Sequence, residues 1–439
     1  MSKTGKMRRP PSEPRGISRR GLLKGAAAIG GLAAGSGALT GFPTIWAQNI
    51  KDIVLHHAGP PVTAIPAIAE QASKELGFTV QMQASESADL LNRFLSQSSS
   101  IDCADISLVY MRYLIGRNVL QAIPLSKFRY WDQTLPLFTK GEYADGRKAP
   151  QQGIAPTTVL YATDATGQKV TNGTPTEWVT SIPTVTNGDT LGVRPDLTGR
   201  PITSWADLLS PDFKGRAAVQ DNPTIGIIDV AMALEARGDI KYGNKGNMTK
   251  TEIDKTIDTM MELKRSGQFR SFWTSFDQSV NLMASGEVVI QSMWSPAVAA
   301  VRSRGIACKF QPLKEGYRGW GYTLGVMKHV DGLKLDCFNE YMNWYTSGFQ
   351  GAFIARQGYY SAQPENARKF LTAAEWDYWY GGKPAATDIL SPFGKLMEKA
   401  GNVRDGGAYT ERLGNIAVWN SVMDEDRYIT RKWNEFITS

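Results

Sequence analysis

Aromatic side chains recur where predicted strands end, and this pattern is the main chemical signal in the chain. In residues 287–301 the apolar run VVI leads to Trp294 and then to an alanine-rich helix that begins near Ser295 and Pro296. We expect Ser295 to cap this helix, because a serine hydroxyl accepts hydrogen bonds from the first turn. Trp294 would then lie at the carboxyl edge of a sheet, where open α/β sheets bind ligands. The alternative is that Trp294 packs over the end of the sheet.

Four more aromatic residues follow predicted strands or lie in loops. Aromatic faces bind apolar groups and attract cations, so several of them at one edge indicate a ligand site, although each alone is compatible with packing. These four residues are Tyr110, Trp320, Tyr322 and Tyr359. The carboxylates that would complete a cation site, or else lie on the surface, are Glu86, Asp221 and Asp277.

Residues for acid–base or metal chemistry are scarce. The chain has three histidines, and it lacks the sequence motifs of serine hydrolases, phosphate-binding loops, dinucleotide-binding folds and zinc proteases. His57 follows the first predicted strand, so we expect it to face a cleft. The His56-His57 pair or the Tyr359-Tyr360 pair is an alternative metal site, for ferric ion in the case of the tyrosines.

The three cysteines give no metal motif. Cys103, Cys308 and Cys337 are far apart, and no Cys-x-x-Cys pair occurs, which argues against zinc and iron–sulfur sites. One disulfide in an oxidising compartment and three buried thiols both remain open. We predict no cofactor and no bound metal.

The basic character of the chain is confined to its start. The 439 residues carry a formal net charge of +7. Residues 1–47 hold eight of the 49 basic residues and one of the 42 acidic residues, which leaves 41 of each beyond residue 47. The remainder therefore has no excess positive charge, and we predict no nucleic-acid partner.

Residues 1–47 have the layout of an export signal. The stretch SRRGLLK at residues 18–24 resembles a twin-arginine signal, and a weakly apolar run and a cleavage-like sequence near Ala47 follow it. A disordered basic tail is the alternative. No later stretch has about 18 consecutive apolar residues, the length of a membrane span. We therefore predict a signal peptide over 1–47, export by the twin-arginine machinery and a mature protein in the periplasm.

From residue 52 the pattern alternates between strand and helix, which predicts a mostly parallel sheet with right-handed crossovers. The segment 52–59 reads as a strand followed by a loop, and 78–85 and 103–110 are predicted strands. The predicted helices between and after them are 66–77, 88–100 and 111–120.

The middle of the chain begins with a different composition. Residues 126–190 are rich in Gly, Pro, Thr and Asn, and the segments 153–164 and 181–193 read as extended. Helical patterns then resume at 227–238, 249–267 and 277–286. The second of these helices has a capping box formed by Thr249 and Glu252.

Five segments together resemble the spermidine/putrescine-type periplasmic binding proteins. Two of them are ITSWADLLSPDFKGRAAVQDNP, at residues 202–223, and ASGEVVIQSMWSPAVAAVRSRG, at residues 284–305. The other three lie within residues 85–128, 312–329 and 337–371. The resemblance covers nearly all of residues 50–375.

The resemblance implies a fold and its divisions. Members of this family have two α/β lobes, each a mostly parallel sheet flanked by helices, joined by two crossing strands and closing on a ligand by a hinge. We expect the crossing strands at 181–193 and 320–326. The expected divisions are a first lobe over 48–185 with an elaboration at about 130–180, a second lobe over 186–321, and residues 322–439, which hold the second crossing, the return to the first lobe and C-terminal helices packing on both lobes.

The family's ligand contacts transfer only in part. Tyr110, Trp294, Trp320 and Tyr359 match aromatic positions that frame polyamines in the family. The family has a tryptophan at the position of His57 and acids at the positions of Asn222, Ile225 and Tyr322. Polyamines need carboxylate partners when they lose water, so the fold and the carrier role carry over better than the substrate.

We therefore predict a solute-binding receptor of an ABC importer, which captures a small organic solute, polyamine-like or otherwise amine-containing. We expect it to act as a monomer, without catalysis, and to deliver the solute to a membrane permease. The predicted ligand-binding residues are His57, Tyr110, Asn222, Asp277, Trp294, Trp320, Tyr322 and Tyr359. The alternatives are a ferric-ion carrier, a twin-arginine-exported enzyme and a sensor with the same fold.

Overall fold

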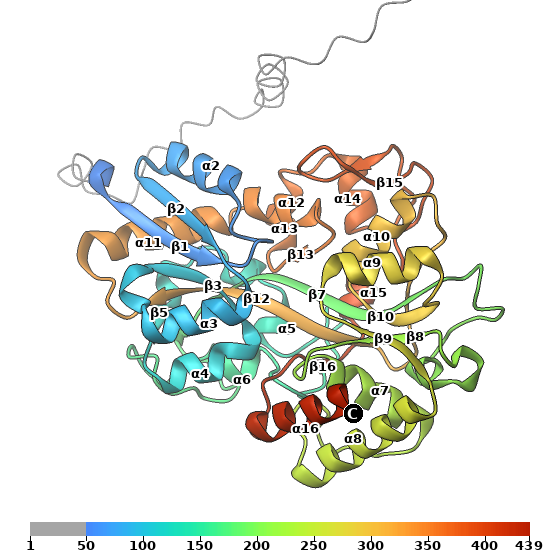
Figure 1. Ribbon diagram of the computed structural model, residues 1–439. Coiled ribbons are helices and arrows are strands. Elements are labelled where there is room, and N and C mark those ends of the chain that lie inside the picture. The colour runs from blue at the N-terminus through green and yellow to red at the C-terminus, as the bar shows by residue number, and fades with distance from the viewer. Residues whose placement is uncertain (1–49) are drawn as a thin grey trace, which may run out of the picture. The chain divides into compact units, whose positions relative to one another are not determined.

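A computed structural model describes residues 50–439, so the predicted signal at 1–47 lies outside the described residues. The main element is a twelve-stranded sheet whose central path runs β2-β1-β3-β12-β7-β10-β8-β9 (Figure 1). Helices pack on both sides of this sheet, as the alternating sequence pattern predicts. Within residues 50–439, no helix is both long enough and apolar enough to span a membrane.

The first part of the sheet is parallel. Strand β1 (Val54–Gly59) pairs in parallel with β2 (Thr79–Ala84) on one side and with β3 (Cys103–Ser107) on the other. The connecting helices are α2 (Pro66–Leu76) and α3 (Ser87–Ser96), which confirms the first two predicted helices.

The third predicted helix, over residues 111–120, is wrong in its second half. Helix α4 is Met111–Gly116, and Asn118 then adopts a positive φ of 57°. The short strand β4 (Leu120–Gln121) follows and pairs with β12. The apolar residues after Gly116 therefore join the sheet instead of extending the helix.

Two long antiparallel strands form the centre of the sheet, where the crossing strands are expected. Strand β7 (Ile182–Val193) is buried along all twelve residues, and β12 is Tyr317–Met327. The first part of β7 also pairs with β13 (Tyr360–Ser361). Its second part pairs with β10 (Ile290–Met293) and β11 (Lys309–Gln311). One strand thus joins both parts of the sheet.

The second part of the sheet is again built from parallel strands. Strand β8 (Ala217–Gln220) pairs in parallel with β9 (Phe269–Trp273) and with β10. The helices of this part are α7 (Gly226–Arg237), α8 (Lys250–Arg265), α9 (Phe276–Ser285) and α10 (Ser295–Ser303). Helix α8 has the predicted capping box, because the side chains of Thr249 and Glu252 each bond the other's backbone N–H.

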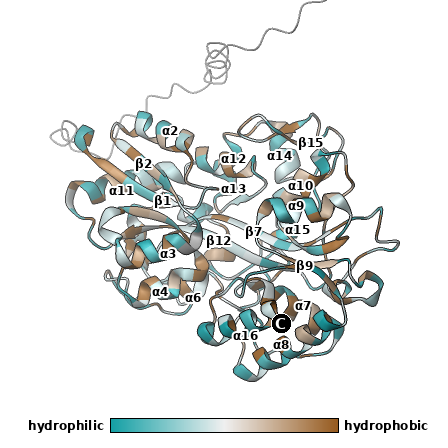
Figure 2. Cartoon of the chain, in the orientation of Figure 1, coloured by the Kyte–Doolittle hydropathy of each residue, from teal (hydrophilic) through white to brown (hydrophobic). Residues whose placement is uncertain are grey.

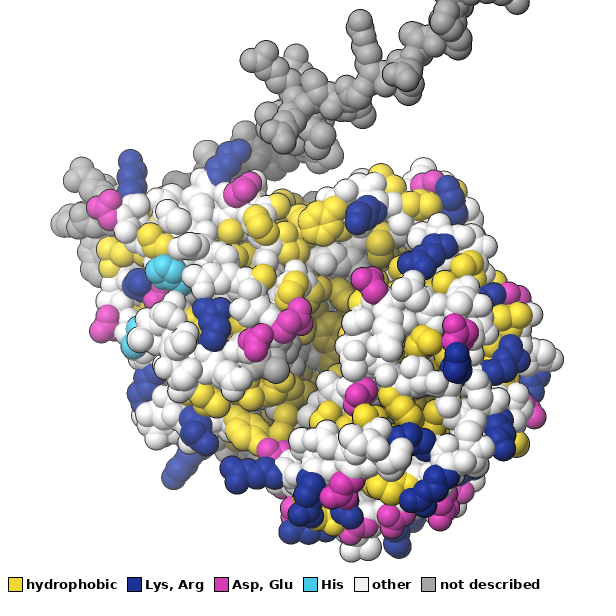
Figure 3. Space-filling model, viewed as in Figure 1, with side chains coloured by type: hydrophobic (Ala, Val, Ile, Leu, Met, Phe, Trp, Pro, Cys, Tyr) yellow, Lys and Arg dark blue, Asp and Glu magenta, His cyan; other side chains and the backbone are white. Residues whose placement is uncertain are grey.

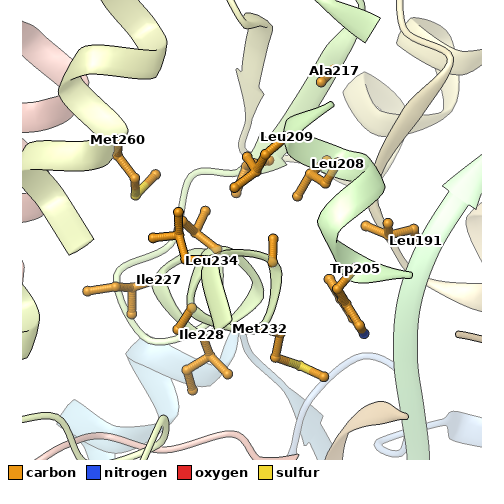
Figure 4. Packing of buried hydrophobic residues seen from close by; sticks show 14 of the residues in the cluster. Leu191, Trp205, Leu208, Leu209, Ala217, Ile227, Ile228, Met232, Leu234 and Met260 are labelled. Carbon is orange, nitrogen blue, oxygen red and sulfur yellow. The ribbon is translucent and has the colours of Figure 1, made fainter. Parts of the chain in front are cut away.

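A large apolar core holds the second part together. Helix α7 is buried along most of its length, and Figure 4 shows its Ile227 and Leu234 among Trp205, Leu208 and Met260 from neighbouring segments. Helix α8 is amphipathic, with hydrophilic residues on one side and hydrophobic residues on the other (Figure 2). The periodicity of α8 therefore determines which of its faces packs inward.

The predicted extended segment at 153–164 is wrong. The structure has the helical turn α6 (Thr157–Leu160) there, and only Tyr161 and Ala162 form isolated strand bridges. Both Val159 and Leu160 are buried, so tertiary packing overrides the β preference of the local Thr and Val residues. Other short elements between residues 123 and 179 are β5 (Ile123–Pro124), α5 (Pro136–Thr139) and β6 (Trp178–Val179).

The last hundred residues return to the sheet. Strand β16 (Ile416–Trp419) pairs in parallel with β12. Helix α16 (Asp426–Thr438) packs against α8 and closes the apolar core with Trp433 and Phe436. The remaining elements are α11 (Gly332–Tyr345), α12 (Phe349–Ala355), α13 (Pro364–Arg368), α14 (Ala373–Trp379), β14 (Ile389–Leu390), β15 (Leu396–Glu398) and α15 (Tyr409–Leu413).

Candidate functional site

Three of the predicted aromatic residues form one cluster on the central strands. The ring of Trp320 meets Tyr322 at a centroid distance of 5.5 Å and Tyr359 at 5.3 Å, both edge to face. Trp320 and Tyr322 are two residues apart on β12, so their side chains leave the same face of the strand. Tyr359 directly precedes β13, which pairs with β7. All three side chains are half-buried, and burial raises the pKa of Tyr359.

Trp294 lies at the carboxyl end of β10, as predicted, and is half-buried. It contacts Trp273 edge to face at 5.0 Å and stacks on Phe276 at 6.5 Å. The prediction that Ser295 caps the helix is wrong, because Trp294 is the capping residue and makes no side-chain cap bond. Ser295 is the first helical residue, and its hydroxyl instead accepts a hydrogen bond from Asn187.

Asn187 connects the neighbourhoods of Trp294 and Trp320. It is fully buried in β7, where it pairs with Trp320 across the ladder. Its side-chain amide donates to Ser295 Oγ at 3.1 Å. The residue after Trp294 is therefore bonded to the residue opposite Trp320, so Trp294 and the cluster around Trp320 lie on adjacent parts of the sheet.

Tyr110, Asn222 and Asp277 each follow the carboxyl end of a parallel strand, which is the edge where such sheets bind ligands. Tyr110 is half-buried, and burial raises its pKa. Asn222 is also half-buried, and its amide oxygen accepts hydrogen bonds from the backbone and hydroxyl of Thr224, which stabilises the turn before α7. Asp277 is exposed and follows Phe276, the residue that stacks on Trp294.

The structure places His57 in a separate, fully buried group under α11. Its Nδ1 lies 2.6 Å from the hydroxyl of Tyr341, and its Nε2 lies 3.1 Å from Asp105 Oδ2. The hydroxyl of Tyr345 donates to the same carboxylate oxygen. Both ring nitrogens of His57 therefore face protein groups, and the structure does not bring this side chain to the aromatic residues of the other strands.

The remaining predicted carboxylates differ in their partners. Asp221 accepts a hydrogen bond of 2.7 Å from the indole of Trp433, which ties it to α16. Glu86 is exposed at the start of α3.

Two charged groups beside the cluster are not among the residues predicted from the sequence. Asp189 is buried in β7 and lies 3.5 Å from Arg318, whose guanidinium also donates to Asp229 at 2.6 Å. Burial raises the pKa of Asp189 to about 6, although nearby Arg318 and Trp320 act to lower it. The sequence feature that could have indicated Asp189 is the polar triplet Asn187-Gly188-Asp189 inside a predicted crossing strand.

A pocket of about 250 Å³ opens beside Asn222. It is lined by Leu91 of α3 and Tyr113 of α4, by Pro223 and Thr224 before α7, and by six residues between 421 and 430. Figure 3 shows the same face of the molecule hollowed between the side that carries α3 and the side that carries α9, with hydrophobic side chains inside the hollow. The two parts of the sheet therefore border a common opening.

The residues proposed for a metal do not converge. Within residues 50–439, no group of three or more His, Cys, Asp or Glu side chains could hold a metal ion. Tyr359 packs on Trp320, whereas Tyr360 packs on Tyr380 and lies under the guanidinium of Arg404. The three cysteines are free and buried.

Comparisons with known proteins agree with this fold. A search of curated proteins gives no match. Among solved structures, the spermidine/putrescine ABC transporter substrate-binding protein PotD from Streptococcus pneumoniae superposes with a TM-score of 0.58 at 14% identity, covering 88% of this chain and 97% of that one. A spermidine/putrescine ABC transporter protein from Listeria monocytogenes gives 0.58 and 14%, covering 88% and 98%.

The fold recurs in a protein with a different ligand. AgtB from A. tumefaciens R10, solved with agropinic acid, superposes with a TM-score of 0.51 at 12% identity and covers 88% of this chain and 99% of that one. The chain thus has the two-lobed periplasmic-binding-protein fold predicted from its sequence. The family model for bacterial extracellular solute-binding proteins matches residues 67–376, well over half of the chain. The chain belongs to the family of bacterial extracellular solute-binding proteins.

Proposed function

We propose that this protein is the exported receptor of an ABC importer, which captures a small organic solute between its two lobes and delivers it to a membrane permease. The observation that carries the proposal is the aromatic arrangement at the centre of the sheet. We take the cluster of Trp320 and Tyr322 on β12 with Tyr359 before β13 as one wall of the site, and Trp294 at the end of β10 as the other. The bond from Asn187 to Ser295 fixes these walls beside each other.

The chemistry of these walls favours a solute with an apolar or amine-containing part. Aromatic faces contact hydrocarbon and attract cations. Few carboxylates are available to pair with several ammonium groups, because Asp221 is bonded to Trp433 and Asp189 is paired with Arg318. Asp277 is an exposed acid that directly follows Phe276, the residue that stacks on Trp294. We therefore infer a solute with fewer amines than a polyamine, for which Asp277, Asn222 and Tyr110 would supply polar contacts.

Thermal unfolding of the purified protein, freed of carried-over solute, tests this proposal. The panel contains polyamines, amino acids, sugars, quaternary amines and ferric citrate. A solute at a hundred times its dissociation constant stabilises the folded state by about 2.7 kcal/mol. We expect a monoamine or quaternary amine to raise the unfolding midpoint more than spermidine does.

The matched variants are Trp320→Ala and Trp294→Ala, with Trp376→Ala as the control. Trp376 is a half-buried tryptophan that stacks on Tyr380, outside the proposed site. We expect the two site variants to lose at least tenfold in solute affinity and the control to keep it. Equal affinity in all three variants would contradict the proposed site, and a response to ferric citrate alone would favour the ferric-ion carrier instead.

A further inference from the structure

A small cavity lies between α10 and the segment that runs from Tyr378 to Arg412. Its volume is about 20 Å³, which is room for one water-sized particle. Ser295, Pro296 and Gly358 contribute to its lining, and so do three arginines, Arg302, Arg404 and Arg412. The cavity therefore borders the residues next to Trp294 and Tyr359.

Two of the three arginines form no ion pair within residues 50–439, and Asp189 acts on Arg412 only from beyond 4 Å. Arg302 pairs with Glu398 and Asp405. Arg404 donates to the backbone carbonyls of Trp379 and Gly358 only, at 3.0 and 2.7 Å. Within residues 50–439, no carboxylate lies within 4 Å of the Arg404 or Arg412 guanidinium, and the titratable groups lining the cavity carry a formal net charge of +1. Burying such a charge without a partner is costly.

The unpartnered polar atoms around the cavity are all donors. The Nε groups of Arg302, Arg404 and Arg412 and the indole Nε1 of Trp379 are buried and have no hydrogen-bond partner. No acceptor on the lining residues is left without one. Arg404 is 4% exposed and Arg412 is 1% exposed, so bulk water does not satisfy these groups. The partner that is missing here must accept hydrogen bonds.

Aromatic rings supply only part of the compensation. The guanidinium of Arg404 lies 4.5 Å from the ring centroid of Tyr360 and 4.7 Å from that of Trp379, and Arg412 lies 5.0 Å from that of Phe310. Burial lowers the pKa of Arg404, and nearby Arg412 lowers it further. The two guanidinium groups therefore repel each other as like charges. An anion between them would offset this repulsion.

We propose that this cavity binds one small monovalent anion, in the size class of chloride, held by Arg404 and Arg412. The anion would also support the neighbouring site, because Arg412 donates to Asn187 and Arg404 donates to the carbonyl that precedes Tyr359.

Crystals of the unmodified protein grown in bromide give the direct test. Bromide scatters anomalously, and we expect an anomalous peak in the cavity between Arg404 and Arg412. Bromide peaks on the surface together with an empty or water-filled cavity would overturn the proposal. This measurement needs no variant, so it stays decisive even if changing a buried arginine prevents folding.

Thermal unfolding in chloride and in gluconate at equal ionic strength gives the solution test. We expect chloride to raise the midpoint by at least about 2 °C, a shift that a well-occupied site would produce in a chain of this size. The Arg412→Gln protein should lose this difference. The control Arg368→Gln removes an exposed arginine that also lies over a tryptophan ring, and it should keep the difference. A chloride response that Arg412→Gln retains in full would contradict the proposal.

The anion has two potential sources, a free halide and the acid group of an organic solute. Acetate replaces chloride in a parallel series to distinguish them. Stabilisation by chloride alone assigns the cavity to a halide, whereas equal stabilisation by acetate assigns it to a carboxylate. No stabilisation by either ion overturns the anion site.

Discussion

The side-chain amide of Asn187 donates a hydrogen bond of 3.1 Å to the hydroxyl oxygen of Ser295, across 108 residues of sequence. The amide oxygen of the same side chain accepts a hydrogen bond from Arg412 at 3.2 Å. Asn187 lies on the strand that joins both parts of the sheet, and Ser295 follows Trp294. One buried amide therefore couples the crossing strand, the Trp294 wall and the arginine cavity.

We predict that Asn187→Ala lowers the free energy of unfolding by about 1–3 kcal/mol, because the buried guanidinium of Arg412 would lose an acceptor and the hydroxyl oxygen of Ser295 would lose a donor. We also expect weaker solute binding, since the position of Ser295 and Trp294 would no longer be fixed. Denaturant unfolding and solute titration measure the two effects. The control is Asn281→Ala, which removes an exposed asparagine bonded to Arg304 and should change stability by less than about 0.5 kcal/mol.

The buried carboxyl of Asp189 should make stability depend on pH. Burial raises its folded pKa to about 6, from an ordinary value of 3.8. Because the pKa is higher in the folded state, protonation of Asp189 stabilises the fold. This stabilisation is complete below pH 3.8 and is lost as the pH rises through 6. The wild-type protein should therefore gain on the order of 3 kcal/mol relative to Asp189→Asn as the pH falls from 7 to 4. Denaturant unfolding of both proteins at several pH values measures this difference, and a difference that stays flat would contradict the raised pKa.

The charged group of Arg318, Asp189 and Asp229 should be sensitive to the loss of its cation. Arg318 is 1% exposed and donates to Asp229 at 2.6 Å. The Arg318→Met variant leaves two buried carboxyls without a cation, so we expect it to lower the free energy of unfolding by about 3–5 kcal/mol.

The matched control for this variant is Arg270→Met. Arg270 bonds Glu287 through two nitrogens, but both side chains are about half exposed. We expect the control to cost less than about 1 kcal/mol, because exposed ion pairs contribute little. Similar losses of unfolding free energy in the two variants would show that burial of Arg318 does not increase the cost of removing it.

Gly153 makes a close backbone contact between the region 126–190 and the C-terminal strand. It has a φ of 74°, and a Cβ atom there would lie 2.0 Å from the carbonyl oxygen of Trp419. We expect Gly153→Ala to lower the free energy of unfolding by about 3 kcal/mol or more, from backbone strain and overpacking together. The control Gly146→Ala has a φ of 84° but no atom within 4 Å of the added carbon, so it should cost only about 1 kcal/mol. Thermal or denaturant unfolding compares the two.

Local sequence patterns determined much of the architecture. The alternation of strand and helix predicted the parallel strands β1, β2 and β3, because each segment buries one face at its own period. The capping box at Thr249 predicted the start of α8, because its bonds join residues only three apart. The apolar run before Trp294 also predicted its position at a strand end, whereas the two crossing strands were expected from the resemblance to spermidine/putrescine-type binding proteins.

Only the tertiary structure decided which side chains meet. Residues 153–164 have a local β preference, but the structure has a helical turn there. Ser295 accepts a hydrogen bond from Asn187 instead of capping its helix. Arg412 reaches Asn187 across 225 residues, and His57 reaches Tyr341 across 284. Local periodicity carries the direction of a side chain but not the identity of a distant partner, which depends on how the sheet brings its strands together. The chain thus specifies its strands and helices locally, whereas the buried polar groups beside the site exist only once the fold is complete.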